Sequence, residues 1–247
     1  MSASSQSTYT LNGYSVRESR RARRVSLRVS RMAEVDIVVP CGYPQERLLE
    51  WVKTQQAWID RTVKKVEQER RSRPQESQET LPTKIVLRSL SEEWTVHYEA
   101  DEGENIRLQV LSAQKLMLKG RIDHEPTCHD LLQQWVRQQA KYYLPQWLRE
   151  ISRETGLRYQ KATVRRQKTL WGSCSNQANI SLNDKLLFLP FPLVRYVLVH
   201  ELCHTRHLNH SDAFWALVGR KEPDYRQLDQ TLNNAWHYVP DWLTAPC

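Results

Sequence analysis

Short stretches in which β-branched or aromatic residues alternate with polar ones occur in separate parts of the chain, and they predict β-strands. The runs are bounded by glycine, proline or small polar residues, as strands usually are. The expected strands cover residues 9–16, 25–29, 35–39, 84–87, 93–99, 106–110, 115–118, 159–164 and 179–182.

Apolar residues at three- and four-residue spacing predict helices between and after these strands. The longest pattern runs from Gln45 to about Arg71 and carries Trp51 and Trp58 one heptad apart, which we expect to be core anchors. A second helical pattern covers 129–155, where Pro145 should kink the helix or split it in two. Three shorter helices are expected at about 191–206, 211–219 and 224–236.

A polar stretch that contains two prolines separates the two groups of strands. We therefore predict an N-terminal region of strands and one long helix at residues 1–73, a linker at 74–83, and a second domain at 84–247. The alternative is that the second region forms one continuous domain with residues 9–73.

Composition narrows the class of protein. The 247 residues suffice to bury a core, and charges interrupt every apolar run, so we expect no membrane-spanning helix and no membrane partner. Residues 1–8 lack the basic and then apolar pattern of a signal peptide. The five cysteines are odd in number and scattered. These features favour a reduced, cytoplasmic protein.

The net charge of +8 is concentrated near the N-terminus, where residues 1–80 hold 15 Lys and Arg against 10 Asp and Glu. Such a run can attract nucleic acid, nucleotide phosphates or an acidic protein. It can equally be a solvated strand edge, where charge prevents edge-to-edge pairing. The arginines concerned are Arg17, Arg20, Arg21, Arg23, Arg24, Arg28 and Arg31.

The segment Val-Leu-Val-His-Glu-Leu-Cys-His at 197–204 is the most informative. Residues four apart lie on one face of a helix, so the imidazoles of His200 and His204 can bind one cation. Zinc accepts imidazole nitrogen, and a catalytic site keeps one position for water. Glu201 is then placed to take a proton from that water as general base. The alternative is a core helix whose histidines only form hydrogen bonds.

The third zinc ligand is predicted to be His210. Asn209 is a good helix terminator and Ser211 can cap the next helix, which puts His210 in a turn from which it can reach the metal. His207 is the rival, but it continues the helical line of the first two histidines, and three ligands in one line surround a tetrahedral ion poorly. His207 is then expected at the surface, on the substrate side of the site, or as a residue that supports the ligands from behind.

A second segment, 165–175, is expected to contribute to substrate binding. Its glycine permits a close backbone approach, and the segment is either an edge strand that pairs with an extended substrate or a turn whose tryptophan packs under the metal helix. Two arginines, together with His207, are also candidates for stabilising an oxyanion. The residues of this segment concerned are Arg165, Arg166, Trp171, Gly172, Ser173 and Cys174.

Five motifs resemble the YgjP-like metallopeptidase family, a bacterial branch of the zincins related to SprT-like and WLM proteins. They are WGSCS at 171–175, NISLN at 179–183, VLVHELCH at 197–204, NHSDAFW at 209–215 and EPDY at 222–225.

The resemblance implies a zincin-type site with His200, His204 and His210 as ligands and Glu201 as catalytic carboxylate. It also implies an α+β fold in which the metal helix packs on a small sheet. A family name does not establish peptide cleavage, so the substrate stays open between a peptide and a nucleotide.

Three functions compete at this point. The first is a zinc metallopeptidase that uses Glu201 to activate water. The second is a metal-dependent nucleoside triphosphate pyrophosphatase or phosphohydrolase, in which the arginines hold phosphates, although a site of histidines alone suits zinc better than magnesium. The third is a DNA-associated module with structural zinc, which would normally need a fourth protein ligand.

Overall fold

The computed structural model describes residues 8–20, 22–29, 33–71, 81–101, 103, 105–112 and 114–243. The chain divides into two compact units, residues 1–78 and 79–247, and each is described by itself. The predicted linker lies outside the described residues except for its last three positions, and so do Arg21 and Arg31. Within the described part of the chain, no helix is both long and apolar enough to cross a membrane.

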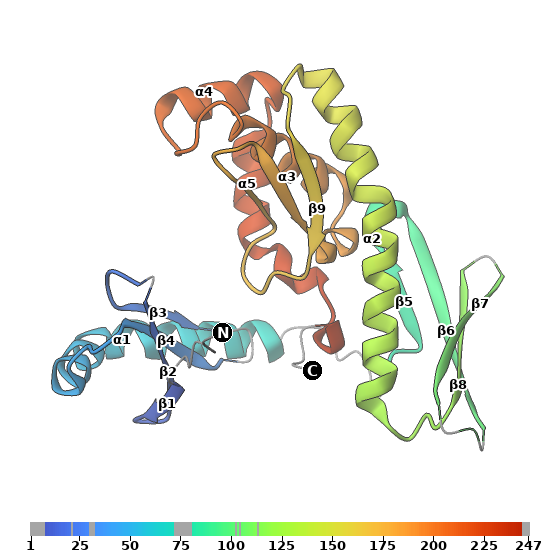
Figure 1. The fold of residues 1–247 in the computed structure, drawn as a ribbon, viewed down its shortest axis with the longest axis horizontal. Coiled ribbons are helices and arrows are strands. Elements are labelled where there is room, and N and C mark those ends of the chain that lie inside the picture. Colours follow the sequence, from blue (N-terminus) through green and yellow to red (C-terminus); the bar gives the residue numbers. More distant parts are fainter. Residues whose placement is uncertain are drawn as a thin grey trace, which may run out of the picture. The chain divides into compact units, whose positions relative to one another are not determined.

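The first unit is a four-stranded sheet followed by one long helix (Figure 1). Its strand order is β1-β2-β4-β3, in which only β2 and β4 run parallel. The sequence predicted a single strand over 9–16, and this is wrong: the chain turns at Asn12 and Gly13, both with positive φ, as in tight hairpins. The elements are β1 (Thr8–Leu11), β2 (Tyr14–Ser19), β3 (Ser26–Val29), β4 (Val35–Pro40) and α1 (Gln45–Arg71).

Helix α1 spans the predicted residues, but its tryptophans do not anchor the core. Trp51 is half-buried and Trp58 is 44% exposed. The fully buried stripe passes instead through Leu48, Val52 and Ile59, which pack on the inward-facing residues of the sheet. Ile59 therefore occupies the buried position, and Trp58, one residue earlier, points about 100° away from it.

The second unit begins with another four-stranded sheet and a helix of 31 residues. The strand order is β5-β6-β8-β7, with β6 and β8 parallel. Trp94 of β6 meets Trp135 of α2 edge-to-face at 4.8 Å between ring centroids. The elements are β5 (Lys84–Leu87), β6 (Glu92–Ala100), β7 (Arg107–Ser112), β8 (Lys115–Gly120) and α2 (Glu125–Thr155), with a 3₁₀ turn at Arg88–Leu90.

Pro145 does not split α2, which continues as one helix from Glu125 to Thr155. A proline inside a helix costs about 3 kcal/mol, because it removes a hydrogen bond and clashes with the preceding turn. Leu144 and Leu148 on either side of it are fully buried, so packing in the core offsets that cost. The helix ends at Gly156, whose φ of 72° suits a C-terminal cap.

The rest of this unit combines a three-stranded sheet with three helices, so the fold is α+β. The strand order is β10-β11-β9, with β11 antiparallel to β10 and parallel to β9. Helix α2 packs against this part as well as against the first sheet of the unit (Figure 1). The elements are β9 (Lys161–Arg165), β10 (Gly172–Cys174), β11 (Asn179–Asn183), α3 (Phe191–Cys203), α4 (Asp212–Lys221) and α5 (Tyr225–Asn234), with 3₁₀ turns at Asp184–Phe188, Ala235–Tyr238 and Asp241–Leu243.

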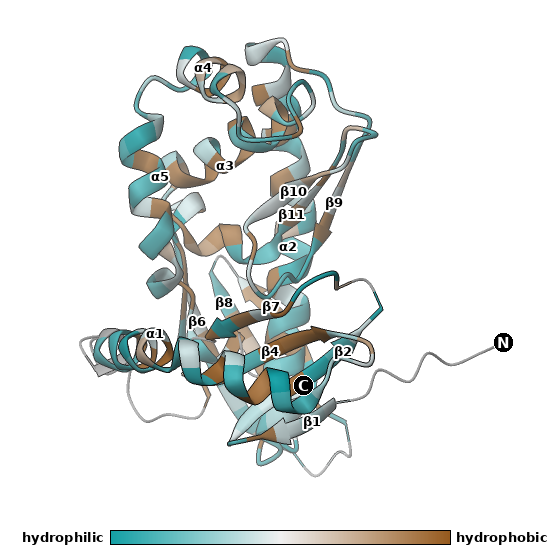
Figure 2. Ribbon diagram, turned by 90° about the vertical axis from the view of Figure 1, so that its left-hand side faces the viewer, coloured by the Kyte–Doolittle hydropathy of each residue, from teal (hydrophilic) through white to brown (hydrophobic). Residues whose placement is uncertain are grey.

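Helix α3 is the centre of this arrangement. Figure 2 shows it coloured hydrophobic along most of its length, and it is buried on nearly all sides. An apolar surface all around a helix is typical of one in the middle of a core. It starts after Pro190 and ends at Cys203, so the histidines of the sequence motif lie at its C-terminal end.

Candidate metal centre

Three histidines converge where α3 gives way to the loop before α4. The Nε2 atom of His200 lies 3.2 Å from Nε2 of His204 and 3.1 Å from Nε2 of His210. One ligand atom of each lies within 4.8 Å of the others, and in the described part of the chain this is the only group of its kind that could hold a metal ion. His200 and His204 lie one turn apart on α3, whereas His210 precedes the N-cap of α4.

The ring of His204 is held by the loop that follows it. Its Nδ1 donates to the backbone carbonyl of His207 at 2.9 Å, which leaves the Nε2 lone pair facing the other histidines. The side chain of His207 does not belong to the cluster. The structure therefore brings His210 to the first two histidines and uses His207 through its main chain.

The electrostatics of the cluster favour neutral imidazoles, which are the form that binds metals. Burial, and to a smaller extent the neighbouring histidines, lower the pKa of His200 to about 3. Burial also lowers the pKa of His204. Phe214 of α4, itself fully buried, lies against all three rings, with centroid distances of 4.5 to 5.0 Å.

Glu201 is buried beside the cluster, with only 6% of its surface exposed. Burial raises the pKa of its carboxyl group to about 8, and its Oε2 atom has no hydrogen-bond partner among the described residues. Gly172 lies directly against it: a Cβ added to this glycine would come within 2.7 Å of Cγ and Oε1 of Glu201. The close approach that the sequence suggested for Gly172 is therefore an approach to this carboxylate.

Gly172 begins β10, which forms one edge of the three-stranded sheet and packs beside α3. Residues 172–174 are thus a strand, and Trp171 is buried and stacks on Trp236, in the 3₁₀ turn after α5, at 4.0 Å between centroids. Ser173 and Cys174 are half-buried on the same short strand. Burial raises the pKa of the Cys174 thiol to about 11, which does not suit a nucleophilic thiolate.

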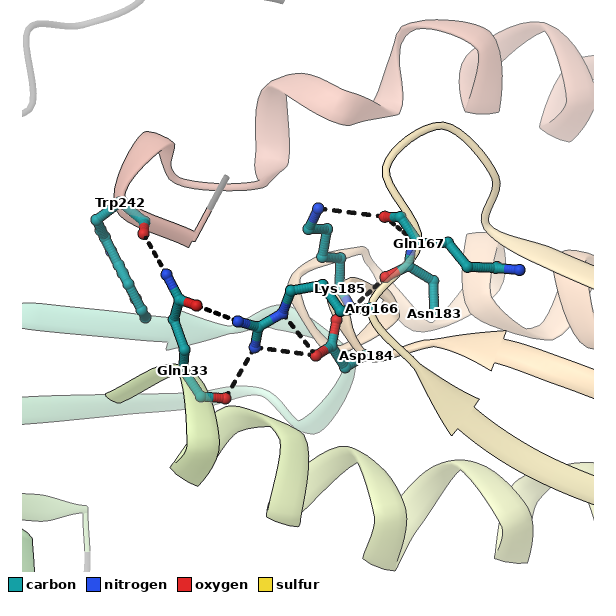
Figure 3. Close-up of polar contacts among 7 residues, drawn as sticks. All are labelled: Gln133, Arg166, Gln167, Asn183, Asp184, Lys185 and Trp242. Carbon is teal, nitrogen blue, oxygen red and sulfur yellow. Dashed lines mark hydrogen bonds and ion pairs between the residues drawn. The ribbon is translucent and has the colours of Figure 1, made fainter. Parts of the chain in front are cut away.

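The two arginines before this strand differ in their surroundings. Arg165 is exposed. Arg166 binds the fully buried Asp184 through Nε at 3.0 Å, and its other nitrogens donate to the side chain and the carbonyl of Gln133 (Figure 3). Gln133 in turn donates to the carbonyl of Trp242 at 2.9 Å. These contacts make Arg166 part of a structural network rather than a free cation.

The same network fixes the loop that leads into β10. Asn183 and Lys185 both donate to the carbonyl of Gln167, at 3.0 and 3.3 Å (Figure 3). Asn183 also donates to the carbonyl of Leu170 at 2.7 Å. The sequence analysis assigned no role to Asn183 or Lys185. The asparagine that closes the NISLN motif was the available signal, since a buried amide at a strand end often holds a neighbouring loop.

Comparisons with known proteins agree with this site. The family model described as YgjP-like, metallopeptidase domain matches residues 23–235, which is most of the chain. The chain belongs to the YgjP-like family. This family membership makes it a metallopeptidase-type hydrolase domain and implies a metal ion, for which the three histidines are the candidate ligands.

Solved structures offer a partial likeness to this YgjP-like chain. The crystal structure of the metallopeptidase zymogen of Pyrococcus abyssi abylysin is 22% identical and covers 38% of this chain and 95% of its own, with a TM-score of 0.34. The family assignment therefore rests on the sequence match. No curated protein matches the chain.

Proposed function

We propose that this protein is a zinc-dependent metallopeptidase in which Glu201 is the general base. The observation that carries the proposal is the convergence of three imidazole Nε2 atoms beside a buried carboxylate. The donor set fits zinc, which favours nitrogen ligands, better than magnesium or calcium, which favour oxygen. Three protein ligands also leave a fourth position open, as in catalytic rather than structural zinc sites.

When bound, zinc would act as a Lewis acid that lowers the pKa of water and polarises a carbonyl group. The residues of the chain supply the rest of the chemistry. The Glu201 carboxylate takes the proton of the attacking water and passes it to the leaving amine. Burial raises the pKa of Glu201 to about 8, and a zinc ion bound by the neighbouring histidines would oppose this effect by favouring the ionised carboxylate.

The edge of β10 supports a peptide as substrate. Gly172, Ser173 and Cys174 pair with β11 along one side, so the backbone groups on their other side can pair with an extended chain. Because Gly172 lies against Glu201, a peptide on this edge would pass beside the general base. Exposed Leu170, just before the strand, is available to contact an apolar side chain of that peptide.

The Glu201→Gln variant tests this mechanism. The amide keeps the size of the side chain but cannot accept a proton, so we expect hydrolysis to fall by a factor of about 10² to 10⁴ while zinc content stays at one ion per chain. Zinc content and the rate of cleavage of a peptide library are measured on the same samples, with His204→Ala as the variant that loses the metal. A zinc-loaded Glu201→Gln protein that still cleaves peptides contradicts the proposal.

The same samples are tested with nucleoside triphosphates. Release of phosphate or pyrophosphate that disappears in His204→Ala, without peptide cleavage, would replace the peptidase by a phosphoanhydride hydrolase. The structure supplies little for phosphate recognition at this place, because Arg166 is already bound to Asp184 and Gln133.

A further inference from the structure

His210 is the least supported of the three histidines. It is exposed and lies in the loop before α4, whereas the other two share α3. An exposed side chain on a loop can occupy several rotamers, and holding it in one costs conformational entropy. A metal site that uses such a residue gains affinity if another group holds the ring in place beforehand.

A column of aromatic rings provides that support. The ring of His210 stacks on Trp215 of α4, with 5.5 Å between centroids and 23° between planes. Trp215 stacks in turn on Tyr225, the first residue of α5, at 5.6 Å and 21°. The three rings are thus nearly parallel and link the loop, α4 and α5.

Tyr225, at the other end of the column from His210, packs closely against α4. Gly219, one turn after Trp215 on α4, faces the ring of Tyr225, and a Cβ added there would lie 3.1 Å from Cε1 of the tyrosine. The Tyr225 hydroxyl accepts a hydrogen bond from Nε of Arg226 at 3.2 Å. Tyr225 is therefore packed against α4 and supports the outer face of Trp215.

Phe214 and Trp215 of α4 contact the histidines differently. Phe214 touches all three rings and stacks on His204 at 4.5 Å and 25°. Trp215 stacks on His210 and meets His200 only edge-to-face, at 6.0 Å. Phe214 is fully buried and belongs to the core, so its replacement would disturb the fold. Trp215 is only half-buried, which makes its contact with His210 separable from the core.

We propose that Trp215, backed by Tyr225, is a positioning residue that holds His210 in the orientation in which it binds the metal ion. The inference rests on the proposed zinc site and adds to it: α4 and α5 set the metal affinity although neither helix contributes a ligand.

Zinc affinity, measured by competition with a chromophoric chelator, tests this role. We expect Trp215→Leu to weaken zinc binding about tenfold. Loss of a group that orients a metal ligand typically lowers metal affinity by a factor of about 10 to 100, and this value is at the lower end. Trp215→Phe keeps a ring and should recover most of that loss. The matched control is Trp147→Leu, a half-buried tryptophan that contacts Tyr143 and Phe191 instead of the site, and it should leave zinc affinity unchanged.

A double-mutant cycle with His210→Ala separates positioning from general destabilisation. If Trp215 acts through His210, then Trp215→Leu should have less than about a twofold effect on zinc affinity in the His210→Ala background. Thermal unfolding of the four metal-free proteins establishes that each is folded at the temperature of the titration.

The outcomes are distinct. An equal loss of affinity in both backgrounds, or no loss in either, overturns the positioning role and leaves the zinc site standing. A wild-type chain that fails to bind one zinc ion overturns the proposed function and this inference together.

Discussion

Gly172 and Glu201 leave no room between them. Because the backbone of β10 is held by its pairing with β11, a methyl group at position 172 must displace the carboxylate rather than the strand. Catalytic groups tolerate little displacement, since a misplacement of about 1 Å can cost a factor of 10² in rate.

We therefore expect Gly172→Ala to lower kcat/KM roughly a hundredfold while zinc content is unchanged. The control is Gly103→Ala, where an added Cβ meets nothing within 4 Å. Peptide hydrolysis and zinc content are measured for both variants. Normal turnover by Gly172→Ala would show that Glu201 does not act from the position in which the structure holds it.

Sequence reasoning was able to name these residues because their chemistry is local. The helical spacing of His200 and His204 puts them on one face whatever surrounds them, and a helix break after them leaves His210 free to join. What Gly172 faces could not be predicted, because its contact with Glu201 joins two segments about thirty residues apart in the chain.

At the scale of elements, the buried pair of Arg166 and Asp184 joins the end of β9 to the turn after β11, and Gln133 ties it to α2. Removing one partner of a buried ion pair leaves an uncompensated charge, which typically costs about 3–5 kcal/mol. Asp184 is fully buried, so water does not replace the lost guanidinium.

Arg166→Ala should accordingly lower the free energy of unfolding by about 3 kcal/mol, while its exposed neighbour gives a matched control, Arg165→Ala, with a change within about 0.5 kcal/mol. Urea denaturation of both variants measures the difference. If Arg166→Ala instead raised KM without loss of stability, the role in substrate binding that the sequence suggested would be restored.

The elements show where local patterns suffice and where they fail. The helix at Gln45–Arg71 was predicted from its apolar spacing, and the structure has it begin at Gln45 as expected. For α2 the sequence left a kink and a split open, and the split is wrong, since the burial of Leu144 and Leu148 outweighs a local signal from Pro145. Residues 9–16 were predicted as one strand although the Asn-Gly pair at 12–13 is a typical hairpin signal, and the positive φ of both residues in the structure is what such a turn requires.

At the scale of the whole molecule, the described part of the first unit carries several exposed arginines, one of which, Arg28, has Asp36 directly opposite it in the β3–β4 pairing. Arg17 of β2 and Arg28 of β3 are exposed, and the loop between these strands adds three more exposed arginines. Within the residues that the structure describes, the side chains of these five arginines form no ion pair or side-chain hydrogen bond. The loop arginines are Arg20, Arg23 and Arg24.

We expect this unit to bind nucleic acid weakly through its phosphates, with an affinity that falls steeply as the salt concentration rises. The logarithm of the association constant should fall with the logarithm of the salt concentration, with a slope of about −0.9 for each phosphate contacted. Replacing Arg17 and Arg28 by glutamine should reduce both the affinity and the slope. The control removes two charges from helix α1, Lys53→Gln with Lys64→Gln. If both double variants lost the same affinity for nucleic acid, or if binding did not depend on salt, the arginines would be solvated surface residues without a role in binding.

The shortness of β10 has a consequence for selectivity. Three residues extend only about 10 Å, so a peptide that paired with this edge would form few backbone hydrogen bonds, and few of its side chains would contact the protein. Binding of this kind would discriminate poorly between peptide sequences and would require a segment that is already extended. The rate of cleavage would then depend on how exposed a polypeptide segment is and on its local concentration more than on its sequence. A damaged protein differs from an intact one in exposure, and a tethered protein differs in local concentration.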